Sequence, residues 1–120
     1  MFIFEDNPTF EWPIKISLPN KGDYLEFEIT GIFRIVDDAE FMAIPENVNT
    51  PSEGVDAEID KLSKVFLGWK DGDVTDVHKE PVEATPANVR RFLAMRPHRM
   101  AVTSAYTEGV TPVHGYRAKN

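Results

Sequence analysis

Large hydrophobic residues alternate with polar ones along two consecutive segments near the start of the chain. In the first segment they stand at Phe10, Trp12, Ile14, Ile16 and Leu18. In the second they stand at Leu25, Phe27, Ile29, Phe33 and Ile35. A period of two predicts strands with one buried face, and the turn residues at 19–23 predict that the two strands form an antiparallel β-hairpin. Pro13 indicates a sheet edge or a strand that starts after it, and Gly31 indicates a bulge or a close crossing.

A helical spacing follows in the middle of the chain. Intervals of four, three, four and three residues separate Val55, Ile59, Leu62, Phe66 and Trp69. Such intervals place side chains along one side of an α-helix. The preceding Thr50-Pro51-Ser52-Glu53 combines a Thr cap, a proline at the first helical position and a Glu three residues after the cap. We therefore predict a buried helix over residues 51–67, followed by a corner at Gly68 and Trp69.

Weaker signals cover the remaining segments. Residues 2–4 are apolar enough for a short strand, Asp37 or Asp38 is a candidate cap for a short helix, and residues 70–84 have the composition of a surface loop. Thr85-Pro86 predicts a helix that ends near residue 95 or 96. Pro97 suits the first turn of a last helix, which Gly109 would terminate. Residues 110–120 lack periodicity, so we predict an extended or disordered tail.

These elements predict an α+β fold in a single domain, residues 1–109. An N-terminal antiparallel β-hairpin or small sheet would pack against about three to four helices in the C-terminal two-thirds. The residues predicted to form its core are Phe27, Ile29, Phe33, Ile59, Leu62, Phe66 and Trp69.

Charge is divided unevenly along the 120 residues. The net charge is −7, yet the first 80 residues hold 7 Lys/Arg and 18 Asp/Glu, whereas the last 40 hold 6 and 2. The acidic part would repel phosphates, which argues against general nucleic-acid binding as the function. No apolar run approaches the roughly 18 residues of a membrane helix, and no signal peptide is apparent, so we expect no membrane association and a cytoplasmic location. The absence of cysteine excludes disulfides and thiolate chemistry.

Catalytic and metal-binding patterns are missing. The three histidines, His78, His98 and His114, lack ligand spacing. The acidic loop from Asp71 fails the calcium-loop pattern at its sixth and twelfth positions. No nucleophile elbow or phosphate loop is present. We therefore expect a protein that is not an enzyme and needs no cofactor or metal.

A basic segment with interspersed apolar residues is the best candidate for a binding surface. The residues that we predict to contact a partner are Arg90, Phe92, Met95, Arg96, Arg99, Met100 and Tyr106. Arginine and methionine are enriched at protein interfaces. Two other interpretations remain open: the basic part lies against the acidic part of the same chain, or the two short helices form a helix-turn-helix that binds DNA.

The order of these signals resembles the small tail assembly chaperones of long-tailed bacteriophages and prophages. The motifs that carry the resemblance are Asn7-Pro8-Thr9-Phe10, Gly31-Ile32-Phe33-Arg34, Phe66-Leu67-Gly68-Trp69, the Thr-Pro-capped helix, Ala105-Tyr106 and the terminal Lys119-Asn120. The resemblance covers nearly the whole chain through short motifs.

Membership of that family would imply a non-enzymatic protein of the host cytoplasm. It would bind the tape-measure protein, with the tail tube protein as a second candidate partner, and keep the tape-measure protein soluble during tail assembly. The family resemblance also implies absence from the finished particle. A structural tail or neck component that self-associates is the alternative function, and a helix-turn-helix-like DNA-binding regulator is the third.

Overall fold

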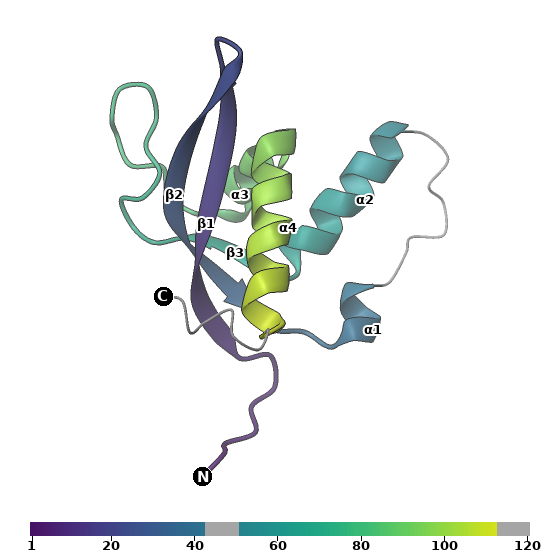
Figure 1. Cartoon of the computed structure of the whole chain (residues 1–120). Coiled ribbons are helices and arrows are strands. Elements are labelled where there is room, and N and C mark those ends of the chain that lie inside the picture. The colour runs from purple at the N-terminus through teal and green to yellow at the C-terminus, as the bar shows by residue number, and fades with distance from the viewer. Residues whose placement is uncertain (43–50, 113–120) are drawn as a thin grey trace.

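In the part of the chain that the structure describes, a three-stranded antiparallel sheet and four helices make up the fold, which confirms the predicted α+β class (Figure 1). The computed structural model describes residues 1–42 and 51–112. The strands lie in the order β1-β2-β3. The elements are β1 (Thr9–Asn20), β2 (Asp23–Arg34), α1 (Asp38–Phe41), α2 (Pro51–Ser63), β3 (Phe66–Trp69), α3 (Pro86–Leu93) and α4 (Arg96–Val110). The helix cap predicted at Thr50 and the tail beyond Pro112 lie outside the described residues.

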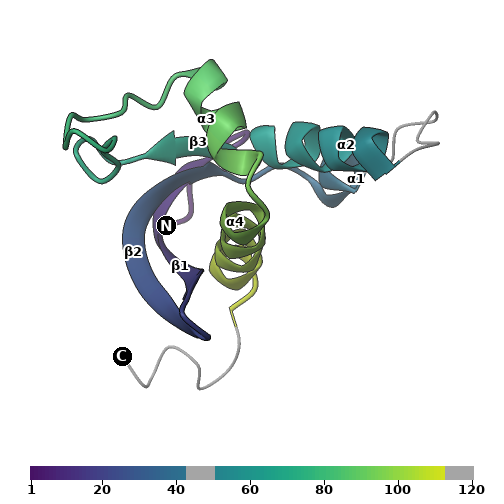
Figure 2. The same cartoon turned by 90° about the horizontal axis from the view of Figure 1, so that it is seen from above.

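The long hairpin formed by β1 and β2 confirms the prediction from alternating hydrophobicity. Its twelve pairs run without a register shift from Thr9↔Arg34 to Asn20↔Asp23. Lys21 and Gly22 form the turn, both with positive φ, as tight hairpin turns require. The register places all the alternating apolar residues on one face. That face is concave, and Figure 2 shows the hairpin curving around α4.

One edge of the sheet is the free side of β1, which carries two prolines. Thr30 directs both its backbone groups away from β1, because its N–H donates to Asp73 Oδ2 at 2.6 Å and its carbonyl accepts from the Lys70 N–H at 3.0 Å. Pro13 lies opposite Thr30 and therefore occupies a pair without mutual hydrogen bonds. Pro19, six residues further along, has the same phase. Both prolines thus stand where a missing N–H costs no bond within the sheet, which confirms the edge position predicted from Pro13.

The core lies between the concave face and α4. α4 runs back along β1, so its C-terminal end reaches the first residues of that strand. Tyr106 packs against Phe10 and Phe33, with ring centroids 6.4 and 5.9 Å apart, and against Phe41 at 5.0 Å. Six of the seven predicted core residues are buried, namely Ile29, Phe33, Ile59, Leu62, Phe66 and Trp69.

Phe27 is the exception among the predicted core residues. It lies on the concave face opposite Ile16, but 49% of its surface is exposed. Its neighbour on the same face, Leu25, is also half-exposed. The alternation placed Phe27 on the correct face, yet α4 covers β1 more than the distal half of β2. The prediction that Phe27 is a core residue is therefore wrong.

The helix predicted over residues 51–67 is too long. α2 ends at Ser63, and Phe66 and Trp69 belong to β3, which pairs with the C-terminal part of β2. The edge of β2 satisfies the backbone of this segment, and Arg34 donates its N–H to the Val65 carbonyl at 2.8 Å. Gly68 has φ of 133°, which a helix cannot contain. The helical spacing continued into β3 because the strand buries the same large residues against the same core.

Further local predictions have mixed outcomes. Asp37 and Thr85 cap α1 and α3, accepting the N–H groups of Glu40 at 2.7 Å and Asn88 at 3.2 Å, as predicted. α4 begins at Arg96 with Pro97 in its first turn, but it continues past Gly109 to Val110. Residues 2–4 form no strand and are strongly exposed, so the short strand predicted there is wrong.

Candidate functional site

The seven residues predicted to contact a partner do not form one surface. Arg99 and Tyr106 are buried, and Phe92 is half-buried. Met95 and Met100 are exposed. Arg90 lines one hollow of the molecule, and Arg96 and Met100 line another. Each hollow is therefore a separate candidate site.

The buried arginine has a structural role at the junction of α3 and α4. Arg99 Nη1 donates to the carbonyls of Leu93 and Ala94 at 3.1 and 2.8 Å. The Nδ1 atom of His98 lies 2.8 Å from the Phe92 carbonyl and therefore donates as the protonated nitrogen. The carbonyls lie at the C-terminal end of α3, where the last groups of a helix lack intrahelical partners, and that of Phe92 also accepts the Met95 N–H at 3.4 Å. The basic residues at the start of α4 thus cap the preceding helix.

Two of the arginines also face the acidic helix α2. Arg90 Nη1 lies 2.7 Å from Asp60 Oδ1, and Arg99 Nε lies 3.8 Å from Glu58 Oε1. The buried Nε of Arg99 has no hydrogen bond, because the contact with the carboxylate is too long. These contacts support the interpretation in which the basic C-terminal part lies against acidic residues of the same chain.

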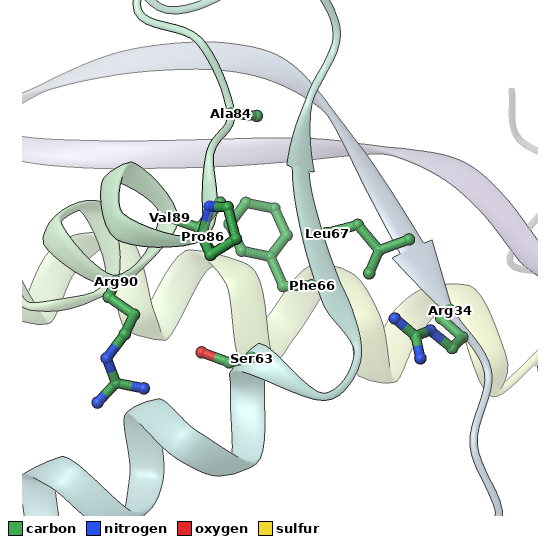
Figure 3. A pocket seen from close by; sticks show the side chains of 8 residues that line it. All are labelled: Arg34, Ser63, Phe66, Leu67, Ala84, Pro86, Val89 and Arg90. Carbon is green, nitrogen blue, oxygen red and sulfur yellow. The ribbon is translucent and has the colours of Figure 1, made fainter.

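A small hollow lies between α2, β3 and α3 and has a volume of about 270 Å³ (Figure 3). Its apolar lining includes Phe66, Pro86 and Val89, and Arg34 and Arg90 stand at opposite sides of it. Arg90 is already paired with Asp60. We therefore assign this hollow to the crossing of α2, β3 and α3 and not to a surface that binds a large partner.

A second hollow lies beside Trp69 and Phe92. These two rings are 5.2 Å apart, and Phe92 also stacks on the His98 ring at 4.3 Å. Arg91, Asp76 and Glu83 contribute the charged part of the lining. Phe92 therefore packs between the Trp69 ring of β3 and the His98 ring of α4. Little of its surface is left to contact an external partner.

The third hollow, between β1 and α4, is the strongest candidate for a binding site. We call it the β1–α4 groove, and its volume is about 510 Å³. It is lined by Lys15, Ser17, Pro19, Tyr24, Arg96, Pro97, Met100, Ala101 and Ser104. Met100 is 63% exposed and Tyr24 is exposed as well. Two cations and no carboxylate line it, although the chain as a whole carries a net charge of −7.

This groove combines apolar and cationic contacts in a way that suits a peptide. Methionine has an unbranched, polarisable side chain that adapts to partners of different shape. An exposed tyrosine offers a large apolar area and one polar end. Lys15 and Arg96 can donate hydrogen bonds to carboxylates of a partner, because no acidic residue lines the groove. The groove can therefore hold an apolar segment that carries acidic residues.

The described residues contain no group of three or more His, Cys, Asp or Glu side chains arranged to hold a metal ion. Among the helices at residues 1–42 and 51–112, none is long and apolar enough to span a bilayer. Burial raises the pKa of the Tyr106 phenol, but this ring lies inside the core and not in the groove.

Comparison of the chain with protein-family models, with curated proteins and with solved structures finds no match. The class that the structure defines is thus an α+β domain with a curved hairpin wrapped on its last helix.

Sequence reasoning identified Arg96 and Met100 of the groove but missed its other wall. In the alternating pattern, Lys15 and Tyr24 lie on the polar face of the hairpin. The pattern therefore indicated a solvated surface and not the wall of a groove. A signal was present, since Pro19 and Tyr24 place an apolar pair on that otherwise polar face at the hairpin end.

Proposed function

We propose that the protein is a tail assembly chaperone of a long-tailed phage or prophage that binds segments of the tape-measure protein. The observation that carries the proposal is the β1–α4 groove, which is lined by the exposed residues Met100 and Tyr24 together with two cations and no carboxylate. The family resemblance of the sequence supplies the identity of the partner. Such a protein acts without catalysis or cofactor, in the cytoplasm of the host.

The physical basis is the shielding of apolar surface. A tape-measure protein is long and helical, and its apolar stripes associate with one another before the tube encloses them. A groove that covers such a stripe removes it from water, at a gain of about 25 cal/mol per Å² of apolar area. The acidic surface of the chaperone keeps the complex soluble. The tail tube protein is a possible second partner.

The test is co-expression of the tape-measure protein with the wild-type chain and with two matched variants. Met100→Glu places a charge in the groove, whereas Met42→Glu makes the same change at an equally exposed methionine outside it, 61% against 63% exposed. We expect the wild type and Met42→Glu to keep the tape-measure protein soluble and to co-purify with it. Met100→Glu should reduce both several-fold, because it removes the apolar contact and its carboxylate competes with the partner's carboxylates for Lys15 and Arg96.

The outcomes separate the function from the site. If the wild-type chain neither co-purifies with the tape-measure protein nor changes its solubility, the proposal of a chaperone function is wrong. If Met100→Glu behaves like Met42→Glu, the chaperone function is retained, but the β1–α4 groove is not its binding site.

A structural component of the tail or neck is the second candidate function. The strongly exposed apolar residues 1–4 favour it, because such a segment suits self-association. Detection of the protein in purified virions would support this candidate and count against the chaperone. The DNA-binding alternative is disfavoured by α4, since it packs against β1 and its Arg99 is buried.

A further inference from the structure

The outer edge of β2 is covered along only part of its length. β3 pairs with Gly31, Ile32 and Phe33, and Asp73 satisfies the N–H of Thr30. Because Thr30 points its backbone groups away from β1, the same holds for Glu28, Glu26 and Tyr24, which have the same phase. Residues 23–28 are all exposed. The distal part of β2 is therefore a strand edge without a neighbour among the described residues.

An apolar surface lies directly beside this edge. Leu25 and Phe27 project from the concave face and are half-exposed. They stand opposite Leu18 and Ile16 of β1. An additional strand on the edge of β2 would extend the concave face and cover these two side chains.

The same chain has an apolar segment without a place to pack. Met1, Phe2, Ile3 and Phe4 are each at least 70% exposed. In an extended strand, Phe2 and Phe4 would lie on one face and Ile3 on the other. The segment leaves the fold at the end of the hairpin opposite to its turn (Figure 1).

The segment cannot reach the free edge of β2 within its own chain. The Pro8 carbonyl accepts the Ile35 N–H at 2.8 Å, which fixes Pro8 at the open end of the hairpin. Glu26 pairs with Ser17, nine residues from Pro8, or about 30 Å along the strand. Phe2 lies six residues from Pro8 and spans at most about 21 Å. The shorter path across the inside of the curve is occupied by α4 (Figure 2).

We propose that residues 1–4 of one copy pair as a short strand with the edge at residues 24–28 of a second copy. Each copy has one donor segment and one acceptor edge at opposite ends of its hairpin, so two antiparallel copies satisfy both contacts. This gives a closed, two-fold symmetric dimer. Phe2 and Phe4 of one copy then lie on the concave face beside Leu25 and Phe27 of the other. The proposal is independent of the proposed function.

The prolines of β1 explain why the acceptor is β2. Pro13 and Pro19 remove two N–H groups from the free edge of β1. The distal part of β2 contains no proline, and its outward positions at Glu26 and Glu28 keep both donor and acceptor, whereas the Tyr24 N–H already donates to Asp23 Oδ1 at 2.8 Å. Only this edge can therefore support a continuous ladder with an added strand.

Sedimentation velocity over a wide range of protein concentration tests the proposal. We expect the wild-type chain to shift from monomer to dimer as concentration rises. The donor variant, Phe2→Asp with Phe4→Asp, and the acceptor variant, Phe27→Asp, should each dissociate at least tenfold more readily. Val77→Asp changes an equally accessible apolar residue in another loop and should leave the dimer unchanged.

Two further measurements address folding and specificity. Glu26→Pro removes a backbone N–H from the free edge of β2, as Pro13 and Pro19 do on β1. It should abolish the dimer, while the monomer keeps its circular dichroism spectrum. A mixture of the donor and acceptor variants retains one intact segment and one intact edge, so it should form a heterodimer although neither variant associates alone. A wild-type chain that stays monomeric, a donor variant that dimerises like wild type, or a mixture without heterodimer would each overturn the proposal.

Discussion

Trp69 donates its indole N–H to the carbonyl of Val82 at a distance of 2.8 Å. Thirteen residues separate the two, and the bond ties the end of β3 to the segment that leads into α3. The indole is almost fully buried and lies 6.4 Å from the Phe66 ring and 5.2 Å from the Phe92 ring. The tryptophan therefore connects the sheet to the helical part of the fold, and it has a structural role.

Substitution of Trp69 should be among the most destabilising changes in this chain. Trp69→Ala is expected to lower the free energy of unfolding by about 3–5 kcal/mol, since it leaves a large cavity. Trp69→Phe keeps much of the packing and loses the hydrogen bond, at a cost of about 1–3 kcal/mol. Chemical denaturation measures both values. An unchanged midpoint for Trp69→Ala would show that the indole is not buried in solution.

Gly68 and Gly22 should differ strongly in their tolerance of an added side chain, because Gly68 has both the less accessible φ, 133° against 82°, and the closer neighbour. Both have positive φ, but an added Cβ at Gly68 would lie 2.4 Å from the Ala84 Cβ, whereas nothing lies within 4 Å at Gly22. Gly22→Ala should cost about 1 kcal/mol from strain alone. Gly68→Ala should cost about 1–3 kcal/mol more, because the chain crossing must open. Equal shifts in melting temperature would contradict this explanation.

Arg99 and Arg90 should differ strongly in their effect on stability. Arg99→Ala leaves the last carbonyls of α3 without their charged donor, and we expect a loss of about 2–3 kcal/mol. Arg90→Ala breaks an exposed ion pair with Asp60 and should cost less than about 1 kcal/mol. Urea denaturation of the two variants makes the comparison. A small effect of Arg99→Ala would restore this residue as a candidate for partner contact.

Alkaline pH should weaken the fold through Tyr106. Burial raises the pKa of its phenol above the ordinary value of 10.0; the backbone hydrogen bond with Val36 lowers it and the charge of Asp38 raises it. The folded state thus favours the neutral phenol. Its contribution is fully present below about pH 10 and is lost as the pH rises through the higher folded pKa.

Removal of this phenol isolates its contribution. Tyr106→Phe should lose less stability than the wild type between about pH 9 and about pH 11. Tyr24→Phe, at an exposed tyrosine, is the matched control and should follow the wild-type curve. Parallel curves for Tyr106→Phe and the wild type would exclude Tyr106 as the cause of alkaline destabilisation.

The hairpin and the helix starts could be predicted because their signals are local. Alternation placed Ile14 and Ile29 on the buried face, and Asp37 and Thr85 are bound to their own helices. The end of α2 could not be predicted in this way. Phe66 meets both a helical spacing and the needs of a strand, and only the distant edge of β2 decides between them.

The candidate site was predictable only in part, for the same physical reason. Arg99 and Met100 are neighbours in the sequence, yet one caps α3 and the other lines the groove. Lys15 and Tyr24 reach that groove from the hairpin, more than 70 residues away in the chain. Composition indicates that a segment can bind a partner, whereas long-range packing determines which of its side chains remain available.

The two prolines of β1 also affect how the protein behaves at high concentration. A sheet with two open edges can stack copy upon copy into a fibre, whereas a sheet with one closed edge cannot propagate in both directions. Pro13 and Pro19 close one edge without weakening the hairpin, since neither position donates a hydrogen bond within it. Replacing both by threonine would restore two donors on the free edge of β1 and allow folded copies to associate edge to edge on that side as well.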